Sequence, residues 1–107
     1  MDAIAKDFGL EAFSAEERRR VWWDTIHNLE CWPDFPAALP RLRQHYYCVS
    51  FTILSFRIIM DTARRNGLSW DAVISCEAIG KYKILPEAYH GCAKFLQFNP
   101  SECCMVA

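Results

Sequence analysis

Two short apolar runs with a helical segment between them constrain the fold of this chain more than any other feature. The first run, residues 46–52 (YYCVSFT), is aromatic and β-branched with little alternation, which is typical of a strand covered on both faces. The second run is residues 70–75 (WDAVIS). Between them, apolar residues recur at helical spacing until Asn66-Gly67, a typical C-terminal helix stop. This order predicts two parallel strands joined by a helix over about residues 54–66.

The C-terminal third of the chain repeats this alternation. Pro86 opens a second helix, expected over about residues 86–98, and Asn99-Pro100 ends it. We expect its buried side to consist of Ala88, Tyr89, Cys92 and Leu96. Residues 103–107 (CCMVA) have the composition of a third buried strand, which gives β-α-β-α-β order. The sequence therefore predicts an α/β fold with a right-handed, mostly parallel sheet flanked by helices.

The N-terminal third is predicted to be helical. Ser14 and Glu17 form a capping box, which places the start of a helix at Ala15 and its end near Leu29. Apolar residues with a 3.6-residue period predict a buried stripe, formed by Val21, Trp22, Ile26 and Leu29. The adjacent Arg18, Arg19 and Arg20 are expected to be a solvated basic turn.

A shorter helix is expected after Pro33, opened by Asp34-Phe35-Pro36. Pro40 lies inside it and removes a backbone hydrogen bond, so the sequence predicts a helix that is short, kinked or shifted in register.

Length and composition limit the function classes. A chain of 107 residues and 12.4 kDa forms one small domain, and a hydrophobic content of 52% indicates a buried core. The net charge of −1 and the pI near 6.3 argue against a nucleic-acid partner. No apolar stretch reaches the ~20 residues of a membrane helix, and the N-terminus lacks a signal-peptide pattern. We therefore expect a cytoplasmic protein with no membrane partner.

The six cysteines do not indicate a disulfide scaffold or a zinc site. Their positions, 31, 48, 76, 92, 103 and 104, contain no pair of C-x2-C motifs. Cys48 and Cys104 lie in apolar strand-like runs and Cys92 on the apolar side of a helix, so we expect these thiols to pack in the core. The adjacent pair Cys103-Cys104 is also compatible with a redox role. No metal or cofactor is predicted.

Three polar side chains form the candidate site. Thr52 ends the first strand, Lys83 lies in the loop before Pro86, and Tyr89 follows in the next helix. In an open α/β sheet such positions converge on one crevice, where a hydroxyl and an ammonium bind an anionic group. The alternative is that Thr52 only ends a strand, Lys83 is solvated and Tyr89 is a core aromatic residue.

The order of several short segments resembles the core of type II haloacid dehalogenases, which belong to the haloacid dehalogenase (HAD) superfamily. The resemblance covers roughly residues 30–107. Its segments are Trp32-Pro33-Asp34, residues 38–42 (ALPRL), residues 50–52 (SFT), residues 65–77 (RNGLSWDAVISCE), Tyr82-Lys83, residues 86–89 (PEAY) and residues 104–107 (CMVA). It implies a Rossmann-like α/β core over residues 31–107, preceded by a remnant of the helical cap over residues 1–30.

The resemblance also implies a reaction and roles for the candidate residues. In this family an aspartate displaces halide from a 2-haloacid, and water hydrolyses the resulting ester. Thr52 matches the strand-end hydroxyl and Lys83 the loop lysine, which support that aspartate as catalytic residues, while Tyr89 matches a substrate-binding tyrosine. The family's Ser-Asn is Thr52-Ile53 here, and no aspartate-bearing strand precedes residue 30. The chain is therefore expected to correspond to an internal part of the enzyme and to be inactive alone.

Two function classes follow from these observations. The first is a truncated hydrolase related to the 2-haloacid dehalogenases, whose partner is a small 2-haloacid or similar acid. The second is a noncatalytic α/β interaction module that forms a homo-oligomer through an exposed sheet edge.

Overall fold

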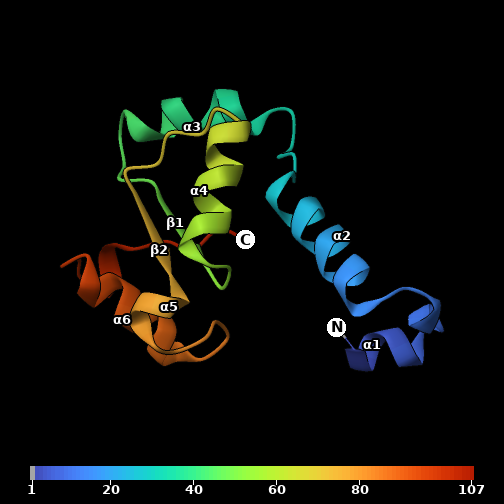
Figure 1. The fold of residues 1–107 in the computed structure, drawn as a ribbon. Helices are drawn as coiled ribbons and strands as arrows, with labels where there is room; N and C mark the ends of the chain where they lie inside the picture. The colour runs from blue at the N-terminus through green and yellow to red at the C-terminus, as the bar shows by residue number, and fades with distance from the viewer. Residues whose placement is uncertain (1) are drawn as a thin grey trace.

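The two predicted strands form a parallel pair at the centre of the molecule. The computed structural model describes residues 2–107, in which β1 (Val49–Thr52) and β2 (Ala72–Ser75) pair in register. Val49 lies opposite Ala72, and Thr52 lies opposite Ser75. Helix α4 (Phe56–Arg65) connects the strands, as the β-α-β order requires (Figure 1). The α/β fold with parallel strands flanked by helices is therefore confirmed.

Local signals set the ends of α4. The Ser55 hydroxyl accepts a hydrogen bond from the amide of Ile58 and caps the first turn. At the other end Asn66 is the C-cap, and Gly67 follows with a φ of 64°, a left-handed conformation that glycine adopts without strain. Ile58 packs the helix into the core with only 5% of its surface exposed.

Three helical elements follow β2. The short α5 (Cys76–Ile79), which was not predicted, begins directly after the strand, and α6 (Pro86–Phe95) packs against it. Ala88, Cys92 and Ala93 are the buried residues of α6, while Tyr89 is half-buried. A 3-10 turn, η2 (Pro100–Glu102), comes after α6.

The prediction of a third strand at residues 103–107 is wrong. These residues form no strand, and their side chains are exposed, with Val106 at 84%. Cys103 has an extended backbone, but an extended segment becomes a strand only when neighbouring backbone groups pair with it. The sheet of residues 2–107 consequently has two strands, and Cys104 lies on the surface and not in the core.

The first strand is also shorter and less covered than predicted. Tyr46 and Tyr47 precede β1 and expose 68% and 74% of their surfaces. Within β1 buried and half-buried residues alternate, because successive strand residues point to opposite faces of the sheet and one face is more covered than the other.

The N-terminal segment leaves the central unit as an arm. Helix α1 (Asp2–Asp7), the 3-10 turn η1 (Leu10–Ala12) and helix α2 (Ala15–His27) follow one another, with α1 at the end of α2 that lies far from the sheet (Figure 1). The predicted capping box is confirmed, since the Glu17 amide donates to the Ser14 hydroxyl and the Ser14 amide donates to the Glu17 carboxylate. These hydrogen bonds hold the pKa of the Glu17 carboxyl below its usual value. None of the helices in residues 2–107 is long and apolar enough to span a bilayer.

The predicted burial of the α2 stripe is wrong. No residue of α2 is buried, and Val21, Trp22 and Leu29 expose 61%, 44% and 45% of their surfaces. The physical reason is that α2 meets the rest of the chain mainly at α4, so most of its surface has no neighbour.

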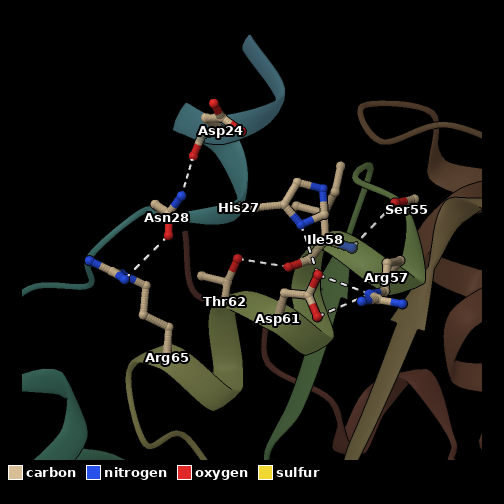
Figure 2. Close-up of polar contacts among 9 residues, drawn as sticks. All are labelled: Asp24, His27, Asn28, Ser55, Arg57, Ile58, Asp61, Thr62 and Arg65. Carbon is tan, nitrogen blue, oxygen red and sulfur yellow. Dashed lines mark hydrogen bonds and ion pairs between the residues drawn. The ribbon is translucent and has the colours of Figure 1, made fainter. Parts of the chain in front are cut away.

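A polar cluster joins α2 to α4 (Figure 2). His27 Nδ1 lies 2.8 Å from Asp61 Oδ2, and Arg57 Nε donates to both oxygens of Asp61 at 3.0 and 2.9 Å. The Arg57 hydrogen bonds, with a smaller contribution from His27, hold the pKa of the Asp61 carboxyl below its usual value. One turn further on, Arg65 donates to the side chain of Asn28 at 3.2 Å. Charged hydrogen bonds therefore fasten the arm at its C-terminal end.

Helix α3 (Phe35–Arg43) returns the chain to the sheet. It runs through Pro40 and buries Leu39, which is 1% exposed. At the end of α3, Arg43 Nη2 donates to Asp71 at 2.9 Å, which ties the helix to the start of β2.

Candidate functional site

Two hydroxyl groups lie at the carboxyl ends of the strands. Thr52 and Ser75 are register partners, and they are 9% and 0% exposed. Ser75 donates to the Leu54 carbonyl at 2.7 Å and accepts from the Glu77 amide at 3.1 Å. Thr52 Oγ1 accepts from the Leu54 amide at 3.0 Å. Both hydroxyls are thus fixed against the turn that follows β1, at the sheet edge where open α/β proteins bind ligands.

A second group gathers around the ring of Phe51. Lys83 places its Nζ 5.2 Å from the ring centroid, and the Tyr89 ring meets Phe51 edge to face with centroids 5.8 Å apart. The lysine comes from the loop between α5 and α6, and the tyrosine from the first turns of α6. Cation–π and edge-to-face contacts therefore bring two of the three predicted site residues to one strand residue.

The relation between Thr52 and Lys83 stays a prediction. Phe51 and Thr52 are neighbours in β1, and successive strand residues point to opposite faces of the sheet. The Lys83 contact with Phe51 therefore places the ammonium near the end of β1 without placing it against the Thr52 hydroxyl.

The charge of Lys83 is not neutralised within the part of the chain that the structure describes. No carboxylate among those side chains lies within ion-pair distance of its Nζ. Lys83 as a whole residue is half-buried, and an ammonium without an ion pair can bind an external anion or support a nearby carboxylate.

The acidic residues next to β2 form hydrogen bonds with groups other than Lys83. Asp71 precedes β2, so it lies about 13 Å along the strand from Ser75 at the opposite end of the sheet. The hydrogen bond from Arg43, followed by the one from the Cys48 amide at 2.8 Å, lowers the pKa of the Asp71 carboxyl. Glu77 follows β2 and accepts from the Phe56 amide at 3.2 Å, which links α5 to α4. Among residues 2–107, no aspartate stands at the carboxyl end of a strand.

Sequence reasoning missed two residues of this site. Ser75 carries the same signal as Thr52, a hydroxyl at the last position of an apolar run, and that signal was sufficient to find it. Phe51 carried no such signal, because an aromatic residue in an apolar run predicts only burial. The described residues contain no group of three or more His, Cys, Asp or Glu side chains placed to hold a metal ion.

The cysteines also differ in their surroundings. Cys92 is buried, and burial raises the pKa of its thiol. Cys103 and Cys104 are exposed, with Cys103 Sγ 3.5 Å from the Asn99 carbonyl and Cys104 Sγ 4.0 Å from the Met105 carbonyl. Each thiol of the adjacent pair thus has its own backbone contact.

Comparison with solved structures connects this arrangement to a group of enzymes. The chain is similar to the L-2-haloacid dehalogenase PA0810, with a TM-score of 0.77 and 29% identity over 91% of this chain and 41% of that enzyme. It is also similar to the defluorinating L-2-haloacid dehalogenase Rha0230, with a TM-score of 0.69 and 30% identity over 72% of this chain and 31% of that enzyme. The chain thus spans less than half the length of either enzyme. No family model and no curated protein sequence matches it.

Proposed function

We propose that this chain, a structural relative of the L-2-haloacid dehalogenases, carries the hydroxyl and lysine part of a site for a small 2-haloacid. The observation that carries the proposal is the edge of the parallel sheet, where Thr52 and Ser75 are paired and Lys83 stands over Phe51. Tyr89, on the same ring, lies close to this edge and binds the substrate. Residues 31–107 correspond to the core of such an enzyme and residues 1–30 to the end of its cap.

Each side chain has a distinct role in this proposal. The Lys83 ammonium attracts the substrate carboxylate and keeps a nucleophilic carboxylate ionised. The Thr52 hydroxyl already accepts from the Leu54 amide, so its own proton remains available for a carboxylate oxygen. A hydroxyl and an ammonium orient these groups, but they do not displace halide.

The chain alone is proposed to be inactive in dehalogenation. Displacement of halide requires a carboxylate in line with the carbon–halogen bond. Asp71 faces the other end of the sheet and is held by Arg43, and Asp61 is held by Arg57 and His27. Neither is placed for this attack.

Halide release from L-2-chloropropionate tests the proposal. The purified chain, produced in a host without dehalogenase activity, is expected to release no halide above the buffer blank. The Lys83→Ala variant serves as the matched control. Halide release by the wild-type chain that Lys83→Ala abolishes would contradict the proposed inactivity and reveal a nucleophile, for which Asp34→Asn and Asp71→Asn are the first variants to assay.

A second candidate function, a noncatalytic interaction module, is favoured by the sheet itself. Each of its two strands has one neighbour within residues 2–107, so each keeps an edge with free backbone groups. Such edges pair with strands of other chains.

A further inference from the structure

The turn after β1, residues 53–55, is held in place by residues at the end of β2. Ser75 Oγ donates to the Leu54 carbonyl at 2.7 Å, and Glu77 Oε2 accepts from the Phe56 amide at 3.2 Å. The Glu77 amide donates to Ser75 Oγ at 3.1 Å and so connects the two contacts. Both contacts join groups 21 residues apart in sequence, so the end of β2 fixes the path of the chain where it leaves β1.

Leu54 links this support to the Thr52 hydroxyl. Its carbonyl accepts from Ser75, and its amide donates to Thr52 Oγ1 at 3.0 Å. The two backbone groups of one residue are separated only by its φ and ψ angles, so fixing the carbonyl restricts the direction of the amide. The amide in turn favours the Thr52 side-chain rotamer that places the oxygen within hydrogen-bond distance. The path of support therefore runs from Ser75 through Leu54 to Thr52.

The Thr52 and Ser75 hydroxyls, which are register partners, differ in what remains free for a ligand. A hydroxyl has one proton to donate. Ser75 is 0% exposed and donates its proton to the Leu54 carbonyl, so it contacts no ligand. Thr52 only accepts, and among residues 2–107 no group accepts a hydrogen bond from its hydroxyl. The free donor of this pair therefore belongs to Thr52, and Ser75 can act on a ligand only through it.

We infer that Ser75 and Glu77 are positioning residues, which hold the Thr52 hydroxyl in one orientation through the turn after β1. The consequence for the binding of a small carboxylate rests on the proposed function, whereas the orientation itself does not. Both residues also satisfy helix amides, because Ser75 caps α5 and Glu77 accepts from the first residue of α4. Capping alone would leave the Thr52 rotamer unchanged on substitution, which separates the two roles.

Three-bond NMR couplings of the full chain, which report the Thr52 χ1 angle, test the orientation directly. The wild type is expected to show the couplings of a single staggered rotamer, and Ser75→Ala is expected to shift them toward the average of the staggered wells. Exchange of the Leu54 amide should rise ~2- to 10-fold, because the hydrogen bond to Thr52 is no longer supported. Ser101→Ala, which removes an exposed serine hydroxyl in η2, is the matched control.

Variants of the exposed Glu77 keep the test decisive if Ser75→Ala does not fold. Glu77→Ala removes the acceptor of the Phe56 amide and is expected to shift the Thr52 couplings in the same direction. Glu77→Gln keeps a side-chain oxygen as acceptor and is expected to restore them. Unchanged Thr52 couplings in Glu77→Ala, or in Ser75→Ala when it folds, would overturn the inference.

Titration of the same variants with L-2-chloropropionate measures what the orientation contributes to binding. We expect Ser75→Ala and Glu77→Ala to weaken binding ~2- to 10-fold, the size of one hydrogen bond, and Glu77→Gln to restore it. Lys83→Ala should weaken binding without moving the Thr52 couplings, since the ammonium lies over Phe51. A wild-type chain that does not bind, with couplings that shift in the variants, would contradict the proposed function and support the positioning. Full affinity in variants with averaged couplings would contradict the role in binding.

Discussion

The arm and the α/β unit of residues 35–102 each contain a helix with a hydrogen-bonded N-cap, α2 at Ser14 and α4 at Ser55, yet the two regions differ in how their helices are held. In the unit, Leu39, Ile58 and Ala88 are buried at 1%, 5% and 0% exposure, and residues far apart in sequence are hydrogen bonded. In the described arm only Ala5 is buried. The comparison teaches that capping signals fix where a helix begins, whereas burial depends on partners that lie elsewhere in the sequence.

The largest expected difference between the two regions is in the cost of removing an apolar side chain. Leu39→Ala is expected to lower the free energy of unfolding by about 2–5 kcal/mol, because it leaves a cavity in the core. Leu10→Ala in the arm, where Leu10 is 42% exposed, is expected to lower it by less than about 1 kcal/mol. Urea unfolding of both variants measures this, and equal losses would remove the distinction between unit and arm.

The second prediction concerns the contact between α5 and α6. A Cβ at Gly91 would lie 2.6 Å from Cγ2 of Ile79, so Gly91→Ala forces these helices apart. We expect a loss of about 1–3 kcal/mol from overpacking, reduced by the higher helix propensity of alanine. The double variant Gly91→Ala with Ile79→Ala removes the atom in conflict. If the two substitutions have additive effects in urea unfolding, the proposed close contact is wrong.

A third prediction uses pH to separate the two regions. The pKa of the Asp71 carboxyl is lowered from 3.8 in the folded chain by Arg43 and the Cys48 amide, so its stabilisation is complete above that ordinary value and disappears as pH falls through the lowered pKa. Asp71→Asn is therefore expected to reduce the stability of the unit at pH 7 and to flatten its acid dependence. The pKa of the Asp61 carboxyl is lowered in the same sense, but Asp61→Asn is expected to release the arm and leave the unit folded. Unfolding curves at pH 7 and pH 3 compare the two variants, and an unchanged acid dependence in Asp71→Asn would contradict the role of that carboxylate.

The smallest effect is expected at the capping box of α2. Ser14→Ala removes the hydroxyl that accepts from the Glu17 amide and is expected to weaken the helix by about 1 kcal/mol. Because α2 lies outside the core, faster hydrogen exchange should be confined to the first turns of the arm. Ser55→Ala, which removes the cap of α4, is the matched variant in the unit and should change global unfolding instead. Exchange that rises across both regions in Ser14→Ala would show that arm and unit unfold together.

Local sequence signals predicted the elements well and their surroundings poorly. The capping box at Ser14, the stop at Gly67 and the start at Pro86 each fixed a helix end to within a few residues, because these signals act through neighbouring backbone groups. Residues 103–107 and the α2 stripe were predicted to be buried, and both are exposed. An apolar pattern indicates that one face of an element is suited to burial, but it does not show which other segment, if any, covers that face.

The candidate site shows the same difference between local positions, which the sequence predicted, and tertiary contacts, which it did not. Thr52 and its place at a strand end followed from the sequence, and the roles proposed for Thr52, Lys83 and Tyr89 came from the resemblance to a family. The Phe51 ring that brings Lys83 and Tyr89 together was not predictable, because ring contacts depend on how the loop after α5 folds back over β1.

The central claim is that the sheet edge at Thr52 and Lys83 binds a small 2-haloacid carboxylate, and amide NMR shifts of the ¹⁵N-labelled chain during titration with L-2-chloropropionate test it most directly. We predict saturable shifts at Phe51, Thr52, Ser75 and Lys83, with a binding constant weakened about tenfold or more in Lys83→Ala, because the variant loses the charge that attracts the carboxylate. Lys94→Ala, on the exposed side of α6, is the matched control and should bind as the wild type does. The absence of saturable shifts at these residues, or binding that Lys83→Ala leaves unchanged, would contradict the claim.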